Sequence, residues 1–514
     1  MIGELPSGWA SAPLDSLCEK LRGVSYKREE ACLLQKSGCL PILRANNIDA
    51  DRLIFGDLVW VPSRCVGDHQ KIRAGDIVVA MSSGSKSVVG KTAQALADWK
   101  GGFGAFCGVL RPYRQLNSRY LGLFLRTREY RSQISSLAAG SNINNLRNEH
   151  FAAIDVPLAP LAEQVRIVSQ LETVLAKADE CQHRIERVAV FLKRLRQSVL
   201  AAAYSGRLTV DWREQNPGAI DASDLIAELE LSHQSAGGHK RGNAAPPTDE
   251  AHDLSTDELP SSWCMTDLRT AVCPDRPITY GILKPGPNTT NGIPYVRVAD
   301  FPNDQLNLEN IRRTTRDIEK TYARARLRTG DILLSIRGTV GRVVVVPPEL
   351  QNANITQDTA RVSIQPALNS DFVMWYLRST PTQKRMQRAV KGVAVRGINI
   401  GDVRALQVPV PPRGEQVEIV RRVEALLGLA DRIEARYMAV KQQVDHLPQS
   451  ILAKAFRGEL VPTEAELAER EGRSYESADE LLKRIRLSKQ TTTRSSENKN
   501  SRRVTRRRSS LRHA

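Results

Sequence analysis

The sequence predicts an α+β protein built as a tandem repeat, in which two globular domains each lead into a long helix. Three observations support this fold class. The chain repeats itself once, each copy begins with short apolar runs typical of strands, and each copy ends in a long stretch with the apolar spacing of a coiled-coil helix.

The repeat has an offset of 252 to 255 residues. Residues 4–9 return as residues 258–263, and residues 75–77 return as residues 330–332. From residue 125 onward the offset settles at 252 and holds as far as Gly206 and Gly458. A drift of one to three residues indicates small loop insertions within a shared fold, whereas a solenoid would have a much shorter period.

The first part of each copy, near residues 1–155 and 255–408, mixes strands and helices. Apolar runs at 76–80 and 331–335 follow a Gly-Asp turn and predict strands, as does the run at 343–346. Residues 120–136 and 372–390 each predict a helix.

The second part of each copy is a long helix. From Val168 to Val199, and again from Val420 to Ile451, apolar or small residues recur in steps of three and four. Because both helices carry one seam pattern, each is best explained as the partner of the other. Pro160 and Pro412 mark the starts, with Glu163 and Glu415 close behind them. Pro448 predicts a kink or an end near Leu447.

Composition points to an anionic partner. The 514 residues include 74 Lys and Arg against 57 Asp and Glu, a formal net charge of +17, which favours nucleic acid. No apolar run suits a signal peptide or a membrane span, and none of the eight cysteines forms a C-x-x-C pair. We therefore expect a soluble cytoplasmic protein.

About half of the excess charge lies in the tail, residues 486–514, which holds ten cations and one acid and is predicted to be disordered. The tail is either a loose phosphate-binding arm or a solvated extension, and the sequence favours neither.

Catalytic motifs are missing from the sequence. Residues 84–92 resemble a phosphate-binding loop but place five residues between the glycines where four are required, and the twin stretch 337–343 lacks the lysine. There is no G-x-G-x-x-G after a strand, no H-E-x-x-H, no G-x-S-x-G and no acidic cluster at metal spacing. We expect no catalytic residue, no metal site and no cofactor bound by this chain.

Polar loop residues are plentiful instead, and their side chains suit contacts with DNA. Arginine can bridge guanine O6 and N7, and Asn or Gln can bridge adenine N6 and N7. The predicted DNA-binding residues are Arg44, Asn46, Ser83, Lys86, Lys91, Asn142, Asn144 and Asn145 in the first copy, and Arg297, Arg337, Arg342, Gln357, Arg396 and Asn399 in the second. Because the helices align well between copies and the loops do not, we expect two domains that recognise different sequences.

The chain resembles the specificity subunit of type I restriction–modification systems. The resemblance rests on the duplicated segment 5–9, on the Pro-rich helix entries 156–168 and 408–420, and on the helix exits 203–208 and 455–460. Each motif is weak alone, but their order and duplication cover about 485 residues and leave out the basic tail.

The resemblance implies two target-recognition domains that each recognise half of a split DNA site, held apart by antiparallel helices. It also implies two methyltransferase subunits and two restriction/translocase subunits as partners, with S-adenosylmethionine, ATP and Mg²⁺ bound in those partner subunits. The expected segments are recognition domains 1–157 and 258–409, spacer helices 158–206 and 410–458, a linker with a short helix 207–257, a C-terminal short helix 459–485 and the tail 486–514.

Helix length supports this interpretation independently. The 31 steps from Val168 to Val199 span roughly 46 Å at ~1.5 Å per residue, and one turn of B-DNA is roughly 34–36 Å. The rival hypotheses are a free-standing sequence-specific DNA-binding regulator, a self-sufficient restriction–methylation enzyme and a coiled-coil scaffold.

Overall fold

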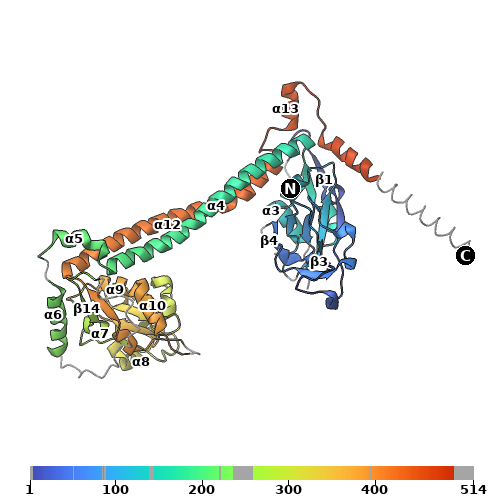
Figure 1. Ribbon diagram of the computed structural model, residues 1–514. Coiled ribbons are helices and arrows are strands. Elements are labelled where there is room, and N and C mark those ends of the chain that lie inside the picture. Colours follow the sequence, from blue (N-terminus) through green and yellow to red (C-terminus); the bar gives the residue numbers. More distant parts are fainter. Residues whose placement is uncertain are drawn as a thin grey trace, which may run out of the picture. The chain divides into compact units, whose positions relative to one another are not determined.

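The computed structural model describes residues 4–49, 51–83, 85, 88–137, 144–218, 221–235, 259–392 and 396–490 (Figure 1). The chain folds into two compact units. The terminal unit comprises Met1–Ile185 and Ala439–Ala514, and the central unit comprises Glu186–Met438. Among the described residues, no helix has both the length and the apolar character that crossing a membrane requires.

Strands of the terminal unit form two main sheets. A four-stranded antiparallel sheet has the order β2-β11-β7-β9, and a three-stranded sheet has the order β10-β3-β6. These strands are β2 (Cys18–Arg22), β11 (Cys107–Pro112), β7 (Ile77–Ala80), β9 (Thr92–Gln94), β10 (Gly102–Phe103), β3 (Cys39–Leu43) and β6 (Val59–Pro62). Smaller pairs join β1 (Ala10–Pro13) to β13 (Asp155–Leu158), β4 (Ile48–Asp49) to β5 (Arg52–Leu53), and β8 (Ser82–Ser83) to β12 (Asn144–Asn145).

The central unit repeats the two main sheets and the β1–β13 pair of this topology. Its four-stranded sheet has the order β15-β21-β18-β19, and its three-stranded sheet has the order β17-β16-β20. The strands are β15 (Thr279–Tyr280), β21 (Thr359–Val362), β18 (Ile332–Ser335), β19 (Val343–Val345), β17 (Arg312–Thr314), β16 (Ile293–Val296) and β20 (Asn354–Ile355), with β14 (Cys264–Asp267) paired to β22 (Gln407–Val410). The predicted α+β tandem repeat is confirmed.

Two segments that are each predicted to form one helix form two helices in the structure. Residues 120–136 fall into α2 (Ser118–Phe124) and α3 (Arg128–Leu137), and residues 372–390 into α9 (Ser370–Arg378) and α10 (Thr380–Arg388). The first break is stabilised by Thr127, whose hydroxyl donates to the Phe124 carbonyl and accepts from the Tyr130 amide. At the second break Pro381 lies in the first turn of α10, and a proline there cannot continue the preceding helix. The shorter helices are α1 (Leu14–Leu17), α5 (Val210–Gln215), α6 (Ala222–Ser235), α7 (Leu268–Ala271), α8 (Arg316–Thr321), α11 (Ile400–Arg404) and α13 (Glu464–Glu471).

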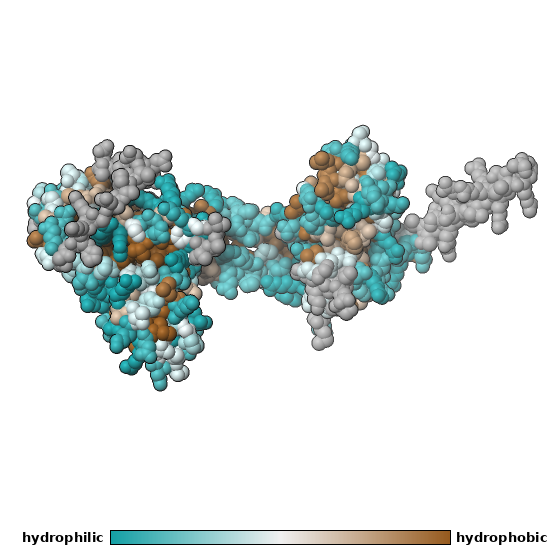
Figure 2. All heavy atoms as spheres, turned by 90° about the horizontal axis from the view of Figure 1, so that it is seen from below, coloured by the Kyte–Doolittle hydropathy of each residue, from teal (hydrophilic) through white to brown (hydrophobic). Residues whose placement is uncertain are grey.

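The two long helices are α4 (Leu161–Tyr204) and α12 (Arg413–Phe456), and the division into units falls within both. In the central unit they run antiparallel, because Arg196 pairs with Asp431 and Glu434 while Arg422, earlier in α12, pairs with Asp211 beyond the end of α4. Their surface is mainly hydrophilic in the view of Figure 2.

The seam is buried only at its ends. Leu171 and Val423 are fully buried, whereas Val440 is 46% exposed and Cys181 is exposed. Leu171 and Val423 belong to apolar cores that also contain residues of the globules.

The predicted end of the helix near Leu447 is wrong, because α12 continues through Pro448 to Phe456. A proline inside a helix costs about 3 kcal/mol. Burial of Leu452, Ala455 and Phe456 in the terminal core offsets that cost. Similarly, residues 478–490 are helical, so the structure corrects the predicted disorder of 486–490, where Leu481, Leu482 and Ile485 anchor the helix in the same core. The rest of the predicted tail and the predicted flexible stretch at 237–247 lie outside the described residues.

Each long helix begins on the same arrangement, which we call the helix-start frame. In the terminal unit the Trp9 indole donates to Glu163 Oε1 (2.9 Å), and the Asn117 amide donates to Gln164 Oε1 (3.1 Å). In the central unit Trp263 donates to Glu415 Oε2 (2.9 Å), and the Asn369 amide donates to Gln416 Oε1 (2.8 Å). These four acidic or amide side chains are fully buried.

The far ends of the two helices are exchanged between copies. Phe456, at the end of α12, packs edge-on against Tyr120 and Phe124 of the first copy. Tyr204, at the end of α4, packs on Phe372 and Tyr376 of the second copy. Each globule is therefore held by the start of its own helix and the end of the other.

Candidate nucleic-acid interface

Three loops of the central unit meet at one edge of the four-stranded sheet. The loop after β18 donates from the Ile336 amide to the Asp358 carbonyl (2.8 Å), and it donates from the Gly338 amide to the Arg396 carbonyl (3.0 Å). The Ile398 amide returns a bond to Ile336 (2.9 Å). These bonds fix residues 336–342, 357–358 and 396–399 next to one another.

Glycine is required at the end of the first loop. Gly341 has φ +100°, and a Cβ there would lie 2.3 Å from Oε1 of Gln383. The same Gln383 donates to the Gly341 carbonyl (2.7 Å), and Gln387 donates to Val340 (3.0 Å). The loop is therefore held in place by α10.

Predicted contact residues of the central unit gather on these loops. The Arg337 guanidinium donates to Gln357 Oε1 (3.1 Å), and both side chains retain exposure. Arg396 and Asn399 are exposed on the third loop. Arg342 donates to the Val298 carbonyl (3.0 Å), which brings the loop after β16 to the same edge.

Arg297 lies on that loop but its charge is neutralised locally. Its guanidinium forms two hydrogen bonds with Asp300, which is buried, and these bonds raise the pKa of Arg297. In this structure the side chain stabilises the turn at 298–300.

The terminal unit builds the same three-loop edge from other side chains. The Met81 amide donates to Phe106 (2.8 Å), and the Leu146 amide donates to Met81 (2.7 Å), as Ile336 and Ile398 do in the central unit. Ser83 and Asn145 lie on the paired strands β8 and β12, and the Asn145 side chain is exposed. The Ala80 amide donates to the Lys91 carbonyl, as the Ser335 amide donates to the Arg342 carbonyl in the central unit. Lys91 therefore occupies the position of Arg342.

The remaining predicted residues of the first copy are divided. Arg44 pairs with Asp57 (2.9 Å), and Asn46 donates to the same carboxylate (3.0 Å), so these two lie together on a separate loop. Asn144 is described only by its backbone, which pairs with Ser83. Lys86 and Asn142 lie outside the described residues.

Phe106 is an exposed residue that the sequence analysis missed. Its side chain is 69% exposed, and its backbone occupies the position of Asp358 in the central unit. The repeat carried a signal, because the 252 offset aligns an aromatic residue with a charged one, which is typical of a surface position.

Comparison with known proteins places the chain in a family. The type I restriction modification DNA specificity domain matches residues 6–188 and 282–441, one match in each copy. The chain is 35% identical over 473 residues to the type I restriction enzyme EcoKI specificity subunit of Escherichia coli K12, covering 89% of this chain and 90% of that protein. It is also 35% identical over 476 residues to the StySPI specificity subunit of Salmonella potsdam, with the same coverage.

Solved structures agree on the fold. The HsdS subunit from Thermoanaerobacter tengcongensis superimposes with a TM-score of 0.52 at 18% identity, covering 89% of this chain and 98% of that one. A chain from work on complex assembly and conformational transition of the type I R-M system gives 0.57 at 18% identity, covering 89% and 100%.

The chain belongs to the type I restriction–modification DNA specificity family. It is a specificity subunit with two recognition domains in tandem, and the main prediction is supported over a free-standing regulator.

Proposed function

We propose that each unit recognises one half of a bipartite DNA target through its three-loop edge. The observation that carries this proposal is the pairing of one backbone arrangement with two sets of side chains. In the central unit the edge presents Arg337, Gln357 and Arg396, and in the terminal unit it presents Ser83, Asn145 and Phe106.

The chemistry of the two edges favours different bases. Arginine next to glutamine suits guanine and adenine edges in the major groove, and Asp358 can accept from cytosine N4. An exposed aromatic such as Phe106 suits the thymine methyl group, and Asn145 suits adenine.

The long helices set the distance between the half-sites in this proposal. Both continue without a break across the boundary of the units, which supports a stiff spacer. Inserting one heptad into both helices should change the spacer of the target and leave the half-site bases unchanged. Altered bases with an unchanged spacer would contradict the proposal.

Catalysis belongs to partner subunits in this account. Two methyltransferase subunits would bind S-adenosylmethionine and modify adenine, and two restriction/translocase subunits would use ATP and Mg²⁺, all in the cytoplasm with the DNA. The names of the relatives, which are subunits of restriction enzymes, support such an assembly. The purified chain alone should transfer no methyl groups, and methyltransferase subunits should copurify with it two to one.

Methylation mapping of the source genome tests the whole function. We expect a bipartite adenine-methylated motif that disappears when this gene is deleted and returns with the intact gene. A methylation pattern that is unchanged by deletion would refute the proposed function.

A further inference from the structure

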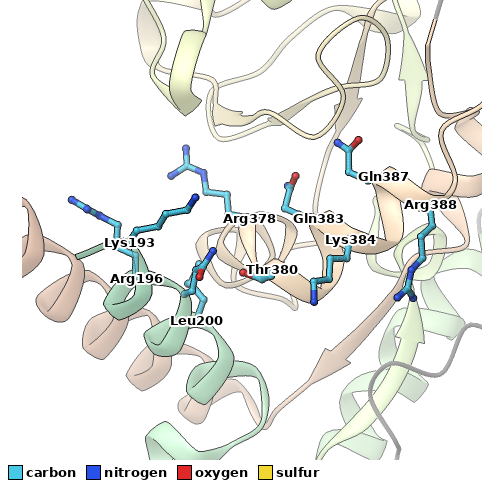
Figure 3. Close-up of a pocket in the computed structure, with 10 residues that line it drawn as sticks. Lys193, Arg196, Leu200, Arg378, Thr380, Gln383, Lys384, Gln387 and Arg388 are labelled. Atoms are coloured by element: carbon cyan, nitrogen blue, oxygen red, sulfur yellow. The ribbon is translucent and has the colours of Figure 1, made fainter. Parts of the chain in front are cut away.

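A basic pocket lies in the central unit between α4 and the α9–α10 pair. It has a volume of about 690 Å³, and Figure 3 shows the residues that line it. Its lining residues include five cations and no acid: Lys193, Arg196, Arg378, Lys384 and Arg388, with Gln197, Leu200, Thr380, Gln383 and Gln387. In Figure 3 the side chain of Lys193 extends from α4 towards Arg378.

Much of this positive charge is not neutralised. Arg196 pairs with Asp431 and Glu434, but among the described residues no carboxylate forms an ion pair with Lys193, Lys384 or Arg378. The Arg378 guanidinium donates instead to the Val343 and Asp304 carbonyls and lies over the Trp375 ring, 5.0 Å from its centroid. Burial lowers the pKa of Arg378. A half-buried cation of this kind is stabilised by an anion that enters the pocket.

The pocket adjoins the loop that is proposed to contact bases. Gln383 and Gln387 line it, and the same two side chains hold the Gly341 and Val340 carbonyls of the loop after β18. Lys384 and Arg388 are four residues apart on α10 and therefore lie on one side of it. If bases of the DNA contact the loop, the backbone phosphates just beyond those bases would lie next to these cations.

The repeat shows that the shared fold does not require the lysines of this pocket. At the 252 offset, Lys193 corresponds to Asp445, Lys384 to Ser132 and Arg388 to Ser136. In the terminal unit Gln449 accepts from the Arg128 amide (2.9 Å) and donates to Arg126 (3.1 Å), and Arg126 pairs with Asp51. Lys193 and Lys384 are therefore particular to the central unit, whereas the terminal unit has Arg128 and Arg131 where the central unit has Thr380 and Gln383.

We infer that this pocket binds backbone phosphates of the DNA flanking the half-site of the central unit, with Lys193 and Lys384 as the contacting side chains. The inference rests on the proposed function. Phosphate contacts fix register and carry no base information, so loss of these lysines should weaken binding without changing the bases that are selected.

The test uses the full chain in the complex in which it is purified. It measures binding to a DNA duplex that carries the motif found by methylation mapping, over a range of salt concentrations. The variants are Lys193→Gln, Lys384→Gln and the double variant. The slope of log K against log salt is negative, and each lost phosphate contact should make it less steep by about 0.9, so the double variant should be less steep by about 1.8. The selected target sequence should stay the same.

Lys320→Gln is the matched control, because Lys320 is an exposed lysine of α8 and lies outside the pocket. Its slope should equal that of the wild type. An unchanged slope in the double variant would overturn the inference, as would a loss of copurifying subunits at an unchanged slope, which would assign the pocket to an acidic protein surface. Neither result would affect the proposed function, whereas a wild-type complex without sequence preference would contradict it.

Discussion

The terminal and central units share their framework and differ at their loops. In both units a tryptophan indole donates to a buried glutamate in the first turn of a long helix. The four-stranded sheets of the two units also have the same strand order. At the three-loop edge the backbone bonds are again the same, yet Phe106 stands where the other unit has Asp358. The comparison teaches that stability and recognition are carried by separate residues, so changes to each should have separable effects.

The largest effect is expected at the exchanged helix ends. Phe456→Ala and Tyr204→Ala each remove a buried ring that packs on two aromatic neighbours, so each should lower the stability of its unit by about 3–5 kcal/mol. Hydrogen exchange followed by mass spectrometry localises the loss. Faster exchange should appear in the terminal unit for Phe456→Ala and in the central unit for Tyr204→Ala. The same pattern for both variants would contradict the exchange of helix ends.

A smaller and unequal effect is expected at the two buried glutamates. Glu415 pairs directly with Arg213 (2.5 Å) and accepts from Thr209 (2.6 Å), so Glu415→Gln should cost about 3 kcal/mol. Among the described residues Glu163 accepts from the Trp9 indole and the Glu464 amide and forms no ion pair, so Glu163→Gln should cost about 1 kcal/mol. Denaturant unfolding measures both, and equal losses would show that Arg213 is dispensable.

The pH dependence distinguishes the Glu163 variant further. Burial raises the pKa of Glu163 despite its hydrogen bonds, so the folded state binds this proton more tightly than the unfolded state. Its contribution is fully present below the unfolded pKa and decreases as pH rises through the folded value. The stability advantage of the wild type over Glu163→Gln should therefore shrink from pH 4 to pH 7. An advantage that grows with pH would refute this sign.

The smallest effect on stability is expected from exchanging the loop residues. Phe106→Asp and Asp358→Phe each place the side chain of one unit on the backbone of the other at an exposed or half-exposed position. Unfolding free energies should change by no more than about 0.5 kcal/mol, while DNA affinity should fall by about 1–3 kcal/mol. Calorimetry and binding to the native target measure the two quantities. A large loss of stability would place these residues in the framework.

Much of the fold could be predicted from the sequence because it depends on local pattern. The repeat gave the number of domains, and the spacing of apolar residues gave both long helices. The extension of α12 past Pro448 could not be predicted, because it depends on burial of Leu452 and Phe456 against residues more than 300 positions away. The exchange of helix ends also escaped prediction, since Tyr204 and Phe456 are both aromatic and either could serve either copy.

The candidate site was predictable in part for a similar reason. The repeat offsets located the loops, and the structure brings Arg337 to Gln357 as the loop arrangement requires. Arg297 forms an ion pair with Asp300, and Arg44 forms one with Asp57. These pairs depend on side-chain geometry, which a sequence does not show. The basic pocket escaped notice because its lysines come from α4 and α10, which are far apart in the chain.

Selection of targets from a randomised duplex library, by the complex carrying either Arg337→Ala or Asn145→Ala, tests the central claim most directly. The account predicts that each variant relaxes base preference in one half-site, a different half for each variant, and leaves the other half and the spacer unchanged. A change in both half-sites with either single variant, or in the same half with both, would contradict it.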